Sequence, residues 1–515
     1  MTKRIVSLIC CVLLIVSSLL VSCAEDNQND TSSAAVSTAG ETSKSEVSEV
    51  EEVSQNSPYD PRYFTEDGEY SANYLPAFDE SWKDYGEFRV LVISNEKETT
   101  YYSEEIEPLY DTTDTAIVDG VTTRNEWIAD KYGITVKAVP TADIYNDILH
   151  EISGGLDTFD AAMPFMPSAA TLARNGNLWN LNDFDFIDLN APWWDANATE
   201  SLSIGDKVYF TASDMTIMQK IVSSGIAFNK DLMAQYFPDF DIYQAVEDGT
   251  WTLDKLYSMS KEITRPLNDD DRMDEDDLWG IIDTGPSFYY GCGEQLINKD
   301  AENYPVIAIG ADERSINAAV KVLEMSIEKK TWMCTTDDFT DRSNVWNEVV
   351  AVFGENRSLF IALHFSAVKK LRPYGVNYGI VPAAKYDEIQ DDYFTKCSAA
   401  YAYGVCIPLS VKDPDFSAYM CDVMALGGKK YVSNTYYNVV LKGRDFEDEK
   451  SEKMLDIIFD GIVYDPAVVY GFSGLNTVIS DLVKAGSTDI VSKLESIQSS
   501  VEASIDEIIE DYEAQ

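Results

Sequence analysis

The alternation of strand-like and helix-like segments between residues 88 and 163 limits the possible folds of this chain more than any other feature. Short β-branched apolar runs predict strands, and apolar residues spaced one turn apart predict helices. The expected order is a strand over 88–93, a helix over 123–132, a strand over 134–139, a helix over 143–153 and a strand over 159–163. This order predicts a mainly parallel, doubly wound sheet. Because ligands bind at the carboxyl ends of strands in such sheets, the loop 164–167, which contains Phe165, is a candidate site.

Residues 1–22 have the arrangement of charged and apolar residues that is typical of a secretory signal peptide. Lys3 and Arg4 precede an almost unbroken apolar run over 5–20, which is shorter than the roughly 20 residues of a membrane-spanning helix. The following Leu20-Val21-Ser22-Cys23 resembles a bacterial lipobox, so we expect cleavage before Cys23 and acylation of this cysteine. The alternative is an ordinary cleaved signal followed by a chance cysteine. Residues 23–58 are polar and predict a disordered linker between the anchor and a folded body.

Composition excludes several classes of function. Lys and Arg number 39 against 89 Asp and Glu, a formal net charge of −50, and nucleic-acid binding needs clustered cations instead. The body has five cysteines without close CxxC spacing, which fits neither a disulfide framework nor a zinc site and predicts buried free thiols. Only His150 and His364 are histidines, so a His-rich metal site is not expected, and no cofactor is predicted.

Seven short blocks downstream carry a family resemblance. They are IGDKVY at 204–209, AFNKDL at 227–232, TWTLDKL at 250–256, FGENRS at 353–358, YGIVP at 378–382, YGVCIP at 403–408 and KDPDFSA at 412–418. In order and spacing they resemble the blocks of extracellular solute-binding proteins of ABC importers, the maltose-binding-protein-like family. The resemblance covers roughly residues 86–510.

The resemblance implies an α/β, two-lobed, periplasmic-binding-protein-like (type II) fold with an interlobe cleft. Lobe one would comprise 86–195 and 402–460, and lobe two 196–401 and 461–515. It also implies a ligand that is a small solute and an ABC permease as partner. We expect a monomer that binds no nucleic acid, and the sequence carries no motif that indicates catalysis.

Aromatic residues are the best candidates for ligand contact, because sugar rings stack on aromatic faces and their hydroxyls need a few polar partners. The resemblance places several of them at the cleft, together with one histidine. The candidate ligand-binding residues are Phe165, Tyr289, Tyr290, His364, Phe365, Tyr401, Tyr403 and Tyr470. Each has core packing as its alternative role, and we expect Trp193 and Trp194 to be structural. Phe365 and Tyr289 are expected to be half-buried platforms for the ligand.

The acidic residues of the chain raise two further possibilities, a calcium site and a catalytic carboxylate pair. Many proteins of the resembled family carry a calcium loop where this chain has the acidic run 268–277; Asp269, Asp271 and Asp277 fit its spacing, but Met273 and Asp274 replace a ligand and the turn glycine. A solvated acidic loop is therefore favoured over calcium binding. A carboxylate pair for glycoside hydrolysis has no local sequence marker.

The sequence thus predicts a lipid-anchored, extracytoplasmic solute-binding protein that delivers a sugar or oligosaccharide to an ABC permease. The alternatives are a secreted glycan-active hydrolase and a surface scaffold without transport function.

Overall fold

The computed structural model describes residues 60–515, apart from 97, 99, 110–114, 270–271, 284–287, 341 and 447. The predicted signal peptide, Cys23 and the linker 23–58 lie outside the described residues. Val53–Gln515 form one compact unit. Within its described part, we find no helix whose length and apolarity would let it cross a membrane.

The first sheet has the predicted parallel topology. Its strand order is β2-β1-β3, with β1 at Glu87–Ile93, β2 at Thr135–Thr141 and β3 at Ala161–Ala162. Both neighbours run parallel to β1, with Glu87 opposite Thr135 and Val90 opposite Ala161. The connecting helices are α1 (Thr115–Tyr132) and α2 (Ile144–Gly154). The predicted alternation of strand and helix is therefore confirmed.

Two of these elements differ in length from the prediction. Helix α1 begins at Thr115, before the predicted start at 123, although its first turns contain β-branched residues and Gly120, which favour helices weakly. Tertiary packing explains the extension: a Cβ on Gly120 would lie 2.6 Å from the carbonyl oxygen of Tyr431, so α1 lies directly against that later segment. Strand β3 is only two residues long, and on its far side Ala162 forms a single antiparallel bridge with Cys406.

The second sheet is mixed. Its order is β10-β4-β9-β5-β8, with β4 at Ser224–Asn229, β5 at Trp279–Asp283, β8 at Met333–Thr335, β9 at Ser358–His364 and β10 at Tyr378–Val381. Strand β4 is antiparallel to β9 and β10, whereas β5 is parallel to β9 and β8. Since Ser224 is opposite His364, the start of β4 and the ends of β9 and β5 lie at one edge of the sheet.

The remaining strands form two small sheets. They pair β6 (Ile297–Lys299) with β7 (Pro305–Ile307), and β11 (Thr395–Lys396) with β12 (Ile462–Val463). The other α-helices are α3 (Met166–Arg174), α4 (Ala196–Leu202), α5 (Met218–Ile221), α6 (Lys230–Tyr236), α7 (Ile242–Glu247), α8 (Leu253–Ile263), α9 (Phe288–Gly291), α10 (Glu313–Ile327), α11 (Val345–Gly354), α12 (Phe365–Val368), α13 (Pro414–Gly427), α14 (Glu449–Asp460), α15 (Pro466–Tyr470), α16 (Val478–Ala485) and α17 (Ile490–Glu513). Short 3₁₀ helices are η1 (Pro61–Tyr63), η2 (Glu80–Tyr85), η3 (Leu181–Asp183), η4 (Lys329–Thr331), η5 (Thr336–Asp338), η6 (Arg372–Tyr374) and η9 (Phe472–Thr477).

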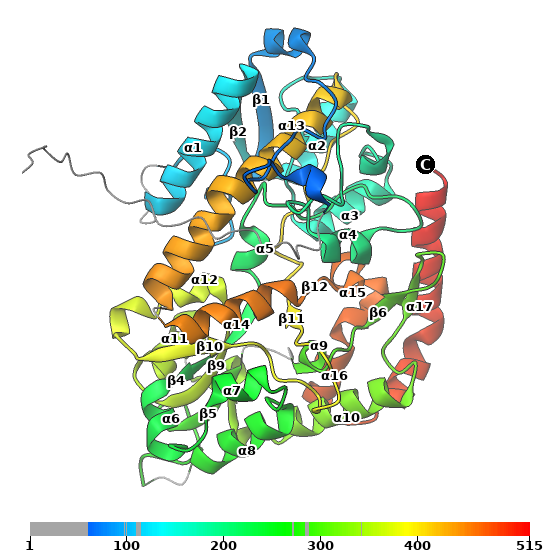
Figure 1. The fold of residues 1–515 in the computed structure, drawn as a ribbon. Coiled ribbons are helices and arrows are strands. Elements are labelled where there is room, and N and C mark those ends of the chain that lie inside the picture. The colour runs from blue at the N-terminus through cyan, green and yellow to red at the C-terminus, as the bar shows by residue number, and fades with distance from the viewer. Residues whose placement is uncertain are drawn as a thin grey trace, which may run out of the picture. The chain divides into compact units, whose positions relative to one another are not determined.

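Helix α13, which lies beside α1 in Figure 1, packs on α1 and continues into two stretches of π-helix, η7 (Gly428–Ser433) and η8 (Tyr436–Asp445). At the start of η7 the helix touches another backbone segment. A Cβ on Gly428 would lie 1.7 Å from the carbonyl oxygen of Asp214, so only glycine fits there. The side chain of Asp214 accepts hydrogen bonds from Lys220 and Ser433, which fixes this contact with a buried charge network.

Several residues that the sequence analysis named are buried in the core. Trp193 and Trp194 are buried and donate their indole N–H groups to the carboxylate of Asp422, so both are structural as expected. Thr252 caps the start of α8, where its side chain accepts a hydrogen bond from the backbone N–H of Lys255. The five body cysteines are free and buried, which confirms the prediction of buried thiols.

Candidate functional site

A cavity of about 600 Å³ opens where loops from the two sheets meet. From the first sheet come Glu98, Thr100 and Tyr101, which follow β1. From the second come Ser224, Asp283 and 361–364, at the edge where β4 starts and β5 and β9 end. Helix α11, the start of α12 and 396–401 complete the wall. We call this space the cleft cavity. Its position agrees with the rule that ligands bind at the carboxyl ends of strands.

Three aromatic side chains line the cleft cavity. Tyr101 and Tyr401 stack on each other with ring centroids 4.5 Å apart, and Tyr401 is 40% exposed. Trp346, on α11, is 59% exposed, the largest exposed fraction among the described tryptophan and tyrosine side chains. A large apolar ring left in contact with water next to a cavity indicates a ligand-binding surface.

Two more aromatic residues support this pair from behind. Phe165, at the N-terminal end of α3, contacts Tyr401 edge-on and stacks on Tyr403. Tyr403 is fully buried and donates its hydroxyl to the carbonyl oxygen of Tyr101 at 2.6 Å. The Tyr101 loop is therefore held in place by a hydrogen bond, and the ring of Tyr401 is held by packing.

The polar lining comes mainly from the second sheet. Asp283 ends β5, His364 ends β9 and Lys396 ends β11. Burial, with a smaller effect from the positive charge of Lys396, lowers the pKa of His364 to about 4, so its imidazole is neutral at pH 7. Burial also lowers the pKa of Lys396, an effect that Asp283 partly opposes. A neutral imidazole can both donate and accept a hydrogen bond, which suits a hydroxyl-rich ligand.

Only two of the candidate residues from the sequence line the cleft cavity, namely His364 and Tyr401. Phe165 and Tyr403 lie behind them, as described above. Phe365 lines a smaller adjoining cavity of about 190 Å³, which shares Thr100, Ser366 and Lys370 with the cleft cavity. Its side chain is only 3% exposed, so the expectation of a half-buried platform is wrong for Phe365. The ring packs between Phe446 and Phe459 instead.

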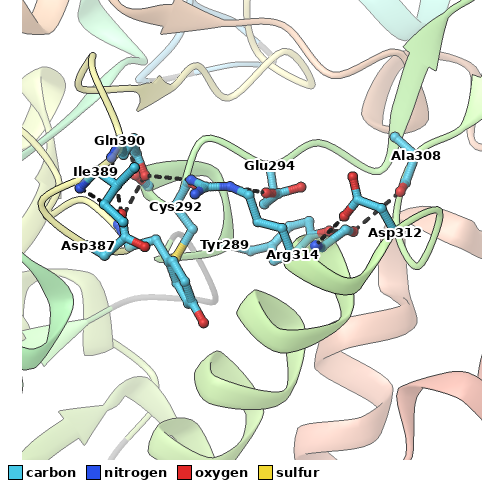
Figure 2. Close-up of polar contacts among 12 residues, drawn as sticks. Tyr289, Cys292, Glu294, Ala308, Asp312, Arg314, Asp387, Ile389 and Gln390 are labelled. Atoms are coloured by element: carbon cyan, nitrogen blue, oxygen red, sulfur yellow. Dashed lines mark hydrogen bonds and ion pairs between the residues drawn. The ribbon is translucent and has the colours of Figure 1, made fainter.

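The same expectation is wrong for Tyr289, whose side chain is fully buried. Its hydroxyl lies 2.9 Å from Ser315 Oγ at the start of α10, where the carboxylate of Asp312 caps the helix. Figure 2 shows Tyr289 and Asp312 on either side of Arg314, which forms an ion pair with Glu294. These contacts join α9 to α10. Tyr289 therefore has a structural role that involves no ligand.

Tyr290 and Tyr470 are also engaged within the protein. Tyr290 is buried; its ring lies under the ammonium group of Lys396, 5.4 Å from the ring centroid, so it supports a cavity residue from below. Tyr470 donates to the carbonyl oxygen of Leu202 and its hydroxyl lies 2.7 Å from that of Tyr512 on α17. These contacts place Tyr470 in the packing between α15 and α17.

The calcium candidates are not brought together in the described structure. Asp271 lies outside the described residues, and Asp269 is exposed. Asp277 is buried, and its carboxylate accepts hydrogen bonds from the backbone N–H groups of Leu267 and Asp274. Within the described residues, we find no group of three or more acidic, histidine or cysteine side chains that could hold a metal ion.

Sequence reasoning missed Tyr101, Trp346, Lys396 and Asp283. Asp283 and Lys396 end short strands, a position that could have singled them out. Trp346 carried a weaker signal, as a large aromatic residue beside polar positions in 343–348. Tyr101 had no such mark, because it becomes a cavity residue only through its contact with Tyr401, 300 residues later in the chain.

No protein-family model matches the sequence, and no curated protein sequence matches it. Solved structures do match. A cyclo/maltodextrin-binding protein complexed with maltotetraose has a TM-score of 0.50 at 12% identity, over 83% of this chain and 97% of its own. The fold is that of the type II periplasmic binding proteins. The GacH receptor of Streptomyces glaucescens, solved unliganded and with acarbose, matches with a TM-score of 0.48 at 15% identity, over 83% and 99% of the two chains.

The predicted fold class, an α/β type II binding-protein fold with two lobes, is therefore confirmed. At 12% identity the match concerns the fold, and it transfers no ligand to this chain.

Proposed function

We propose that this protein is an extracytoplasmic solute-binding protein that binds a carbohydrate in the cleft cavity and delivers it to an ABC permease. The observation that carries the proposal is the cavity lining: exposed Trp346 and the stacked Tyr101 and Tyr401 stand beside His364, Lys396 and Asp283. Aromatic faces with a few convergent polar groups are what a sugar ring needs. The type II fold supports the same proposal, because the structure it matches is a binding protein that holds maltotetraose.

In this proposal the two lobes are 86–195 with 402–460 and 196–401 with 461–515. Tyr101 belongs to the first lobe, and Trp346, His364 and Lys396 belong to the second. A ligand that contacts both sets of residues favours the closed arrangement of the lobes, because it binds the closed arrangement more tightly than the open one. The permease then recognises the closed, loaded protein.

The proposal includes a lipid anchor at Cys23 and a flexible linker over 23–58. Each buried CH₂ of an acyl chain contributes about 0.8 kcal/mol to membrane binding, and stable anchoring takes more than one chain. The strongly acidic body would be repelled by an anionic membrane surface. We therefore expect Cys23→Ala to release the protein into the culture medium, as seen by immunoblotting of cell and medium fractions. Retention of this variant in the membrane fraction would show that the lipobox assignment is wrong.

The proposal also implies binding without turnover. A panel of neutral and acidic mono- and oligosaccharides is screened by thermal shift, where a ligand that binds the native state raises the melting temperature increasingly with concentration. The best ligand is then incubated with the protein and recovered for mass spectrometry. We expect it to be intact. Hydrolysis products formed at a rate proportional to protein concentration would replace the proposal with the glycan hydrolase.

A further inference from the structure

Lys396 has an unusual environment for a lysine. It ends β11 on the wall of the cleft cavity, with its ammonium nitrogen 5.4 Å from the centroid of the Tyr290 ring. Among the described residues, it forms no ion pair within 4.0 Å and donates no hydrogen bond. The cation–π contact compensates only part of the lost hydration of the ammonium group. Its ammonium group is thus left without a charged partner among the described residues, on a side chain that lines the cavity.

The carboxylates nearest to Lys396 are already occupied or too distant to pair with it. Asp283 and Asp465 both raise the pKa of Lys396, against the larger lowering effect of burial. Asp465 caps α15 and accepts the backbone N–H groups of Leu296 and Ala467 at 2.6 and 2.8 Å. Neither carboxylate lies within ion-pair distance of the lysine.

The charges on the wall of the cleft cavity balance one another. Among the described residues, four charged side chains line it, namely Glu98, Asp283, Lys370 and Lys396. The carboxylate of Glu98 accepts the backbone N–H groups of Thr100 and Tyr101, so it is used to shape its own loop. Two lysines thus offset two carboxylates on this wall, in a chain whose Asp and Glu outnumber Lys and Arg by 89 to 39.

We propose that the ligand of the cleft cavity is an acidic sugar, a uronic acid or an oligosaccharide that contains one, and that Lys396 binds its carboxylate. This inference rests on the proposed function. His364 is neutral, and the charge of Lys396 contributes to the lowering of its pKa. Its imidazole donates or accepts a hydrogen bond beside the carboxylate of the sugar. Trp346 and the Tyr101–Tyr401 pair hold the apolar faces of the rings.

A carboxylate fits this site better than a phosphate does. Phosphate recognition typically uses the planar fork of an arginine. Arginine is absent from the described residues that line the cavity. A doubly charged phosphate would also be repelled more strongly by Asp283 than a singly charged carboxylate is.

The test uses sugar pairs that differ only at C6, measured by isothermal titration calorimetry on the purified protein. The pairs are galacturonate and galactose, glucuronate and glucose, and tri-galacturonate with its methyl ester; glucose 6-phosphate and maltotetraose complete the panel. A charge-assisted hydrogen bond makes at least one acid bind roughly 10- to 100-fold more tightly than its neutral partner. In Lys396→Met, this preference falls to about threefold or less. Lys412→Met, at an exposed lysine paired with Asp157, keeps the full preference.

A melting curve without ligand separates binding from folding. Because Lys396 has no ion pair to lose, Lys396→Met should melt at the same temperature as the unmodified protein or higher. The inference is overturned, and the proposed function stands, if neutral sugars bind at least as tightly as their acids in every pair. It is also overturned if glucose 6-phosphate binds more tightly than every uronate, or if Lys396→Met leaves the preference unchanged. Absence of binding to every sugar in the panel overturns the inference and the proposed function together.

Discussion

Trp346→Ala tests whether Trp346 is a platform for the ligand or a core residue, because its indole ring lies mostly outside the core. A tryptophan side chain has up to about 250 Å² of surface, and with 59% exposed about 150 Å² remains in contact with solvent. A sugar ring that stacks on one face covers about half of that area, or 75 Å². At about 25 cal/mol per Å², this contact contributes about 2 kcal/mol. We therefore expect the dissociation constant of the bound sugar to rise by roughly 30-fold in Trp346→Ala.

Isothermal titration calorimetry with the best-stabilising sugar measures this change, and a melting curve without ligand accompanies it. The melting temperature should change little, because the ring makes few core contacts. Trp346→Phe should recover most of the affinity, since a smaller ring can still stack. Tyr85→Ala, at another largely exposed aromatic residue near the first sheet, is the control and should bind normally. Unchanged affinity in Trp346→Ala would refute the assignment of this face to the ligand.

Three further predictions concern the scaffold. Tyr289→Ala should lower the unfolding free energy by about 3–5 kcal/mol in urea titrations and leave sugar affinity unchanged, because the ring is fully buried; weaker binding with normal stability would contradict this. Asp422 has a pKa raised to about 6, mainly by burial, above roughly 4 in the unfolded chain, so its contribution to stability falls by about 3 kcal/mol in all, most of it as pH rises from 4 to 6. Asp422→Asn should lack this pH-dependent part of the unfolding free energy, as measured by urea titrations at pH 4.5 and 7. The prediction is contradicted if the unfolding free energy of Asp422→Asn differs between the two pH values as much as that of the unmodified protein. Asp214→Asn leaves Lys220 without its partner at 2.7 Å and should cost about 3–5 kcal/mol of unfolding free energy; a loss below 1 kcal/mol would show that the network is not stabilising.

The parallel sheet could be predicted because its signals are local. Each strand of the first sheet is a short apolar run, and Asp143 and Gly155 mark the two ends of α2 as an N-cap and a left-handed C-cap. The start of α1 could not be predicted, since it depends on the contact of Gly120 with Tyr431 far along the chain.

The site was predicted less well than the fold, because an aromatic residue has the same appearance in a core and in a cleft. Tyr289 and Tyr401 both follow short apolar or small-residue stretches, yet the first is fully buried and the second is 40% exposed. The difference lies in which elements cover each ring, and that is a property of the tertiary structure. Lys396 illustrates the opposite problem: its importance comes from the lack of a partner within 4.0 Å among the described residues, which no sequence pattern encodes.

The central claim is that a carbohydrate binds in the cleft cavity, and a crystal structure of the protein with its best-stabilising sugar tests it most directly. We expect sugar density between Trp346 and the Tyr101–Tyr401 pair, with a polar group of the sugar within hydrogen-bond distance of His364 or Lys396. A sugar bound elsewhere on the protein, with this cavity filled only by solvent, would contradict the account.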